Sequence, residues 1–377
     1  MASSKPTPDV DGDLTGAYNG IAPDASIVVV KAFDRDGFST YVKVISAIDF
    51  VVTYKDVYGI RVLNLSLSGP VRSYYWDDPL NQAVMAAFQA GIVVVTSAGN
   101  TGPGPMTVGV PGNVPYVITV GAMSDNYSPD DVTDDYLTSF SSAGPTYEGF
   151  VKPDLVAPGG HMIGLMKHNT VLASMHPEFH DGYQFYQMSG TSQAAALTSG
   201  VVALMLQFDA DLSPDDVKCR LMASASPGTT ADGSLFYSIF QQGAGMINAY
   251  RAVYSTSSGC ANKGIDVASD LDDVAHYGGR ANMNADGSFY IMDADGFLWN
   301  DGFLWNDAFL WNNGFLWNDG FLWNDGFLWN DGYLWNDGFL WNDGYLWNDG
   351  YLWNDGFLWN DLRLTNSISI TRPVPQE

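Results

Sequence analysis

Short apolar runs alternate with helical patterns over roughly the first 250 residues, and this alternation limits the folds open to the chain. Ile60–Leu65 and Ile92–Ser97 are near-continuous apolar runs, with Ser26–Phe33 before them and Val114–Val120 after them. Such runs are typical of strands buried on both faces, and helical segments between them supply parallel connections. The sequence therefore predicts an α/β fold whose parallel sheet carries helices on both faces.

Five segments have the spacing or the capping residues of helices. Apolar residues at helical spacing follow Ser39 and Thr40, and Ser213-Pro214 pairs an N-cap serine with a proline at the first helical position. The remaining predicted helices are Leu80–Ala90, a segment from near Ser192 to Leu206, and Gly245–Val253.

Composition limits the partners of the chain. Of 377 residues, 46% are apolar, enough for one large domain and a smaller appendage. A formal charge of −26 argues against nucleic acid or an anionic membrane surface as a partner. No apolar run reaches the roughly 18 residues of a membrane helix, and the N-terminal residues lack the apolar region of a signal peptide. Cys219 and Cys260 could form one disulfide or remain two separate buried thiols.

A repeat of six residues dominates the C-terminal part. Gly296 to Asp361 contains eleven units of the form Gly-Phe/Tyr-Leu-Trp-Asn-Asp, with Ala308 and Asn313 as the main departures. Because six is even, an extended chain presents the same residues to the same face in every unit. We expect a β-solenoid or a series of very short strands that stack aromatic and leucine layers. The aromatic rows could instead bind a glycan or cell-surface polymer, and the Asn-Asp pairs could bind calcium.

These patterns divide the chain into four parts. Residues 1–254 form the α/β domain, 255–295 a polar linker, 296–361 the repeat and 362–377 a C-terminal tail. The divisions follow abrupt changes in composition, of which the start of the repeat is the sharpest.

Residues 188–196 (MSGTSQAAA) place a serine at the start of an apolar helix. Small residues precede Ser192, and an apolar helical segment follows it. The first turn of a helix offers unpaired N–H groups and the positive end of the helix dipole, both of which favour a developing oxyanion. The alternative interpretation is a helix-capping serine, which is common at this position.

Asn100 follows the apolar run Ile92–Ser97. Ligands of open α/β folds bind at the carboxyl ends of the strands, and an asparagine side chain there could donate a hydrogen bond to an oxyanion. The alternative is a turn residue, because residues 97–100 (SAGN) also have the composition of a turn.

Together these two stretches resemble the subtilisin-like serine proteases. Five further segments match that family in chain order: Gly20–Ala25, Asn64–Gly69, Val117–Ala122, Phe140–Pro145 and Lys152–Gly159. The resemblance covers roughly residues 2–254 and implies a subtilisin-like sheet and the hydrolysis of peptide bonds.

The resemblance also implies roles for individual residues. Ser192 matches the nucleophile, and Asn100 matches the side-chain donor of the oxyanion hole. Ala196 stands where the family usually has proline, which is a minor departure. Three residues match the segment that pairs with an extended peptide substrate and walls its specificity pocket: Ser66, Leu67 and Ser68.

The family's motifs for its catalytic Asp and His are not found. In the family both precede the segment matched by Gly20–Ala25, and the aspartates in that region, Asp9, Asp11 and Asp13, do not lie in the Asp motif. The family's Asp-bearing strand lies between the strands matched by Ser26–Phe33 and Ile60–Leu65. We therefore expect a sheet that lacks its N-terminal strands, and an isolated chain that is unstable or prone to aggregation.

Histidines elsewhere are candidates for a substitute base. His176 and His180 have the spacing of two metal ligands on one helical face, but Pro177 intervenes and no third ligand is evident. A solvated surface loop over residues 160–187 is the preferred interpretation. The candidates are His161, His168, His176, His180 and His276.

The resemblance implies a serine endopeptidase that needs no cofactor and acts on peptide or protein substrates. We expect this chain to be an N-terminally truncated form of such an enzyme, nearly inactive alone. One alternative is a catalytically dead module whose repeat binds a surface or a glycan. Another is a half-enzyme that a second polypeptide completes. The retention of Ser192 and Asn100 favours the truncated endopeptidase. Secretion is implied by the family, although this chain carries no signal peptide.

Overall fold

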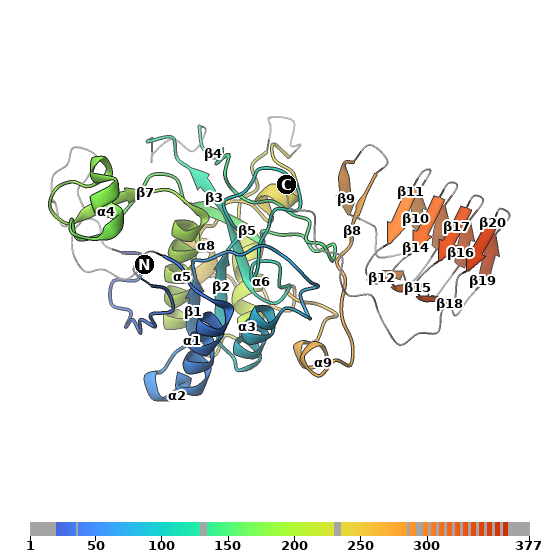
Figure 1. Cartoon of the computed structure of the whole chain (residues 1–377), viewed down its shortest axis with the longest axis horizontal. Helices are drawn as coiled ribbons and strands as arrows, with labels where there is room; N and C mark the ends of the chain where they lie inside the picture. Colours follow the sequence, from blue (N-terminus) through green and yellow to red (C-terminus); the bar gives the residue numbers. More distant parts are fainter. Residues whose placement is uncertain are drawn as a thin grey trace. The chain divides into compact units, whose positions relative to one another are not determined.

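A computed structural model describes residues 20–34, 37–128, 134–229, 235–284 and 287–291, and the strand backbones of the repeat between residues 297 and 360. The chain forms two compact units (Figure 1). The first unit contains Met1–Val71, Tyr75–Gly144 and Lys152–Leu271, and the second contains Arg72–Tyr74, Pro145–Val151 and Asp272–Glu377.

A five-stranded sheet forms the centre of the first unit (Figure 1). Its strands are β1 (Val62–Leu65), β2 (Val93–Ser97), β3 (Ile118–Ser124), β4 (Tyr136–Leu137) and β5 (Leu155–Pro158). The order is β1-β2-β3; β5 is parallel to β3, and β4 is antiparallel to it. β2 and β3 are buried at every residue, which requires cover on both faces of the sheet. The predicted α/β fold is confirmed.

Helices cover this sheet. The longest, α5, packs on β1, β2, β3 and β5, and its apolar residues share one core cluster with the strands. The helices of the unit are α1 (Tyr41–Thr53), α2 (Lys55–Tyr58), α3 (Pro79–Gln89), α4 (Val171–Met175), α5 (Thr191–Phe208), α6 (Pro214–Ser224), α7 (Ile239–Gln242), α8 (Ala249–Val253) and α9 (Val267–Leu271), with a 3-10 turn η1 at Pro177–Phe179.

Capping residues fix where these helices begin. The Thr40 side chain accepts a hydrogen bond from Lys43 N at the start of α1. Ser213 caps α6 and Pro214 is its first residue, as the sequence indicated, and Asp216 completes a capping box with Ser213. At Gly245–Val253 only the last five residues are helical, because Asn248 caps the helix there.

The predicted strand Ser26–Phe33 is wrong. Its described residues form no strand, and the side chains of Ile27, Val28 and Val29 are 55%, 42% and 83% exposed. Among the described residues β1 pairs only with β2, and three of its four residues are half-buried. A strand needs the N–H and C=O groups of a neighbour, and no described strand offers them to this segment.

A hairpin and a disulfide complete the first unit. β6 (Met162–Leu165) pairs antiparallel with β7 (Phe185–Met188), and α4 and η1 lie between the two strands in the sequence. Where the sequence predicted a solvated loop, the structure therefore has regular elements. Cys219 is bonded to Cys260, so the two cysteines form a disulfide rather than separate thiols.

The second unit contains the hairpin of β8 (Ala281–Met283) and β9 (Phe289–Ile291), followed by the repeat. Strands of the repeat pair in parallel with the third strand along, so that Phe297 pairs with Phe315, and equivalent positions of the unit lie in register in three separate sheets. This backbone pairing is that of a three-sided β-solenoid. The strands are β10 (Phe297–Asn300), β11 (Phe303–Asn306), β12 (Phe309–Asn312), β13 (Phe315–Asn318), β14 (Phe321–Asn324), β15 (Phe327–Asn330), β16 (Tyr333–Asn336), β17 (Phe339–Asn342), β18 (Tyr345–Asn348), β19 (Tyr351–Asn354) and β20 (Phe357–Asn360).

The side chains of the repeat lie outside the described residues. The expected stacking of aromatic rings and the alternatives of glycan and calcium binding therefore stay predictions.

Candidate active site

Ser192 lies in the first turn of α5. The helix begins at Thr191 after the N-cap residue Gly190, so Ser192 is its second residue and the helix-capping interpretation is wrong. Ser192 is half-buried. Its backbone N–H belongs to the turn whose donors have no partner within the helix, and those donors mark the positive end of the helix dipole.

Asn100 faces the same turn from the carboxyl end of β2. Its Oδ1 accepts hydrogen bonds from Thr191 N at 3.0 Å and from Thr191 Oγ1 at 2.9 Å. Thr191 Oγ1 in turn accepts a hydrogen bond from Gly99 N at 3.2 Å. Because Oδ1 is held by two donors, the Nδ2 group of Asn100 is left as a donor toward another acceptor.

Two donors converge on a space beside Gly190. A β-carbon placed on Gly190 would lie 3.5 Å from Asn100 Nδ2 and 3.7 Å from Ser192 N. It would also lie 2.8 Å from Oε1 of Gln193, at the end of a flexible side chain. The absence of a side chain at Gly190 therefore leaves open the position where an oxyanion could accept both hydrogen bonds.

Ser66, which follows β1 in the chain, makes two hydrogen bonds with Ser192. Ser66 Oγ donates to Ser192 O at 2.8 Å, and Ser192 Oγ donates a long hydrogen bond to Ser66 O at 3.4 Å. Asn64 Nδ2 donates to Ser66 Oγ at 3.0 Å, and Ser199 Oγ donates to Asn64 Oδ1 at 3.0 Å. A chain of hydrogen bonds therefore runs from the middle of α5 through β1 to Ser192.

Leu67 and Ser68 follow Ser66 in the chain. Ser97 Oγ donates to Leu67 O at 2.9 Å, which fixes this segment to the end of β2. Ser68 is exposed. A β-carbon on Gly99 would lie 2.9 Å from Ser68 Oγ, and one on Gly109 would lie 2.2 Å from the same atom, so the Ser68 hydroxyl lies close to both glycines. The structure thus brings the five residues singled out from the sequence to one place: Ser192, Asn100, Ser66, Leu67 and Ser68.

Two residues of this site had no separate role in the sequence interpretation. Thr191 orients the Asn100 amide, and Gly190 keeps the space between the two donors open. Both lie in the stretch that drew attention to Ser192, but only the folded chain shows what they contact.

The described hydrogen bonds of the five histidines do not lead to Ser192. His161 Nδ1 lies 3.4 Å from Ser124 Oγ, and its ring stacks on Tyr127 at 4.1 Å. His180 Nε2 lies 2.9 Å from Met166 O, and His276 Nε2 lies 2.8 Å from Asp273 Oδ1. Among the described residues, no group of three or more His, Cys, Asp or Glu side chains could hold a metal ion.

An ionic cluster lies buried beside the starts of β3 and β5. Asp154 Oδ2 is 2.7 Å from Lys152 Nζ, and Asp154 Oδ1 is 3.0 Å from Lys218 Nζ. Burial lowers the pKa of Lys152 from 10.5 to about 7, although the carboxylate of Asp154 acts in the opposite direction. The two lysines lower the pKa of Asp154 against the effect of its burial, so the carboxylate stays charged.

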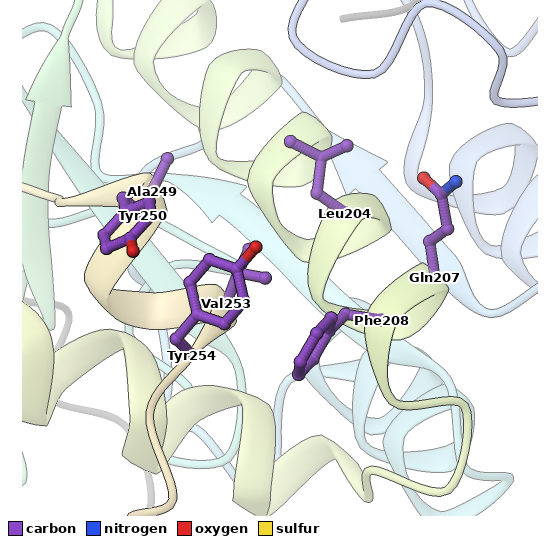
Figure 2. A pocket seen from close by; sticks show the side chains of 7 residues that line it. All are labelled: Leu204, Gln207, Phe208, Ala249, Tyr250, Val253 and Tyr254. Atoms are coloured by element: carbon purple, nitrogen blue, oxygen red, sulfur yellow. The ribbon is translucent and has the colours of Figure 1, made fainter.

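One cavity in the described part of the chain lies away from Ser192. It has a volume of about 450 Å³ between the end of α5 and α8 (Figure 2). Leu204 on its wall is twelve residues beyond Ser192, about 18 Å along the helix. Seven residues line the cavity: Leu204, Gln207, Phe208, Ala249, Tyr250, Val253 and Tyr254.

A model of the subtilase family matches residues 7–262, and the chain belongs to that family. The chain is 37% identical over 244 residues to serine protease AprX of Bacillus subtilis (strain 168), covering 63% of this chain and 54% of that protein. It is 31% identical over 242 residues to subtilisin DY of Bacillus licheniformis, covering 64% of this chain and 72% of that protein. The chain thus spans about half the length of AprX.

One solved structure with a matching chain is that of the prenylagaramide maturation protease PagA. It is 25% identical, with a TM-score of 0.49, and the match covers 65% of this chain and 76% of that one. Among the described helices, none is both long and apolar enough to cross a membrane.

Proposed function

We propose that this chain is the nucleophile-bearing part of a serine endopeptidase. The observation that carries the proposal is the convergence of Asn100 Nδ2 and Ser192 N on the open space beside Gly190. A turn or a capping residue would need no such arrangement, whereas a tetrahedral intermediate of acyl transfer needs two donors at its oxygen.

The reaction follows from this geometry. Ser192 Oγ attacks the carbonyl carbon of the peptide bond and its proton passes to a base, while the carbonyl oxygen becomes an oxyanion that accepts hydrogen bonds from Asn100 Nδ2 and Ser192 N. The carbon–nitrogen bond then breaks, and the amine leaves with the proton from the base. The acyl group remains on Ser192 as an ester, which water hydrolyses with the help of the same base.

We further propose that the Asp and His of this reaction come from a polypeptide segment that these 377 residues do not contain. The described histidines make their hydrogen bonds elsewhere, and Ser192 Oγ has only the carbonyl oxygen of Ser66 as its described acceptor. Among the described strands β1 has one unpaired edge, which supports this proposal, because a parallel strand added there would end beside Ser66 and the nucleophile. In subtilisin, loss of the catalytic histidine alone lowers kcat by about a millionfold.

Labelling by a fluorophosphonate tests the proposal. We expect slow labelling of the chain alone and rapid labelling when a segment carrying the family's Asp and His motifs is co-expressed. Ser192→Ala should abolish the labelling, and Ser46→Ala, which removes a hydroxyl on α1, should not. Rapid labelling of the chain alone would contradict the need for an added base. Absence of labelling with the bound segment would contradict the role of Ser192.

A catalytically dead module with a glycan-binding repeat is the alternative function. This alternative does not explain the hydrogen bonds that Thr191 donates to Asn100 Oδ1, because a module without catalytic activity does not need an oriented amide. Labelling that persists only in the complemented protein separates the two functions.

We also propose that the protein acts outside the cytoplasm on peptide or protein substrates. The disulfide between Cys219 and Cys260 supports this location, because such bonds persist in oxidising compartments. Recovery of the chain in the culture medium of its source cells, with the disulfide intact, would test it.

A further inference from the structure

The hairpin of β6 and β7 is joined directly to the loop that carries the nucleophile. We call residues 160–188 the arm. At its base, Gly190 N donates to Gly159 O at 2.8 Å, and His161 N donates to Ser189 Oγ at 2.9 Å. Because Ser189 and Gly190 immediately precede the first turn of α5, the start of β6 lies beside the site.

The two strands of the arm differ in their pairing. Tyr186 of β7 is paired with Gly164 of β6 on one side and with His180 on the other. β6 pairs only with β7 among the described residues. The arm is therefore a small sheet with β7 inside it and β6 along its free edge.

The register shows which backbone groups of β6 are free. Met166 N donates to Gln184 O at 2.9 Å, and the same register pairs Gly164 with Tyr186. Residues of an antiparallel pair alternate between hydrogen-bonded and non-hydrogen-bonded positions. The N–H and C=O groups of Ile163 and Leu165 therefore point away from β7, toward the free edge.

The side chains of the same two residues are also exposed. Ile163 and Leu165 lie on one face of β6 and are 50% and 49% exposed, whereas Phe185 and Tyr186 of β7 are buried. Soluble proteins usually protect such an edge with charges, proline or a bulge. β6, with the sequence MIGL, has none of these residues.

We propose that the free edge of β6 binds a polypeptide substrate as an added strand, through the residues that follow the bond to be cleaved. This inference rests on the proposed function. The segment Ser66–Ser68 holds the residues that precede the bond, and it contacts Ser192 itself, whereas the arm is anchored to the residues that precede Ser192 in the chain. The segment Ser66–Ser68 thus binds the half of an extended peptide before the cleaved bond, and β6 binds the half after it.

The length and chemistry of β6 define the ligand. Its four residues span about 13 Å and pair with about four residues of a peptide. Two outward N–H groups and two outward C=O groups give affinity that does not depend on sequence. Ile163 and Leu165 favour peptides with apolar or β-branched residues at alternate positions of this part.

Peptide binding to the full chain with Ser192→Ala, which prevents turnover, tests the inference by fluorescence anisotropy. One labelled peptide ends at the residue before the bond, and the other continues with Val-Thr-Val-Thr. We expect the longer peptide to bind about tenfold more tightly, as two to three added backbone hydrogen bonds and apolar contact would give. Equal affinities of the two peptides would overturn the inference.

Ile163→Pro removes an outward N–H group without removing a hydrogen bond to β7, so we expect it to abolish most of the advantage of the longer peptide. The matched control is Val171→Thr, on α4 of the arm, where the side chain is 45% exposed but no strand edge is present. An unchanged advantage in Ile163→Pro would also overturn the inference.

A second measurement needs no variant of the arm. N-methylation of the longer peptide at alternate residues blocks either the N–H groups that face β6 or those that face solvent. We expect one set of methylated positions to abolish the added affinity and the other to keep it. Equal effects of both sets would contradict pairing with β6. Because binding is measured with Ser192→Ala, this outcome is independent of fluorophosphonate labelling.

Discussion

Asn100 and Thr191 are joined by two hydrogen bonds that end on one oxygen atom, although 91 residues separate them in the sequence. Both the backbone N–H and the hydroxyl of Thr191 donate to Asn100 Oδ1. This arrangement fixes which end of the amide is a donor. The first turn of α5 therefore holds the Asn100 amide in place, and its orientation does not depend on contact with a substrate.

The hydroxyl of Thr191 should contribute to stability as well as to orientation. Thr191→Val keeps the shape of the side chain but leaves the buried N–H of Gly99 without its acceptor, which costs about 1–3 kcal/mol. Thr198→Val is the matched control, since Thr198 is on the same helix, is equally buried at 0% exposure, and bonds only to a helical carbonyl. Urea unfolding should show the larger loss for Thr191→Val. Equal losses would mean that the Gly99 contact has no energetic importance.

Gly190 should be required for the chemistry rather than for the fold. Gly190→Ala places a methyl group between Asn100 Nδ2 and Ser192 N, and displaces only the flexible end of Gln193. We expect fluorophosphonate labelling of the complemented protein to fall about 10²- to 10³-fold, as for the loss of an oxyanion donor. Gly104→Ala is the control, because a β-carbon there has no neighbour within 4 Å. Labelling of Gly190→Ala at the parent rate would show that the oxyanion lies elsewhere.

Local patterns were sufficient to predict several of the strands and helices that have partners in the chain. β1, β2, α3 and α5 lie close to their predicted positions because apolar runs, periodicity and caps are properties of short segments. Ser26–Phe33 has the same kind of pattern and forms no strand, since pairing depends on a neighbour that its own sequence does not encode. The apolar pattern indicates that the segment could form a strand, but it does not indicate whether a neighbouring strand is available.

The site could be predicted only in part for a similar reason. Ser192 and Asn100 stand in short, recognisable stretches, so their sequence neighbours indicated them. The orientation of the Asn100 amide, the space beside Gly190 and the free edge of β6 arise from contacts between distant segments. The pairing of Cys219 with Cys260 likewise needed the fold, because two cysteines alone are compatible with either state.

The disulfide should stabilise the first unit. Cys219 and Cys260 are 41 residues apart, and closing a loop of that length lowers the entropy of the unfolded chain by an amount worth about 2–4 kcal/mol. Cys219→Ala with Cys260→Ala should lower the melting temperature by several degrees. Added dithiothreitol should lower the melting temperature of the parent and leave that of the double variant unchanged. A parent that melts at the same temperature with and without the reductant would contradict this role.

The buried cluster around Asp154 should make stability depend on pH in the alkaline range. Lys152 is 1% exposed, and its burial lowers its pKa from 10.5 to about 7. Between about pH 7 and pH 10 the unfolded chain therefore binds a proton at this lysine that the folded chain does not bind. Stability should then rise with pH across this window, by at most about 1.4 kcal/mol per pH unit.

Lys152→Met removes this proton and leaves Asp154 paired with Lys218 at 3.0 Å. We expect the variant to lose the slope between pH 7.5 and pH 9.5 in urea unfolding, while the parent keeps it. The lysine of the unfolded chain titrates near 10.5, above this range, so the stability that the parent gains accumulates steadily from the acid end of the window to the alkaline end. A parent whose stability is flat or falls across the window would show that Lys152 stays protonated in the folded protein. A slope of equal size in Lys152→Met would assign the effect to another group.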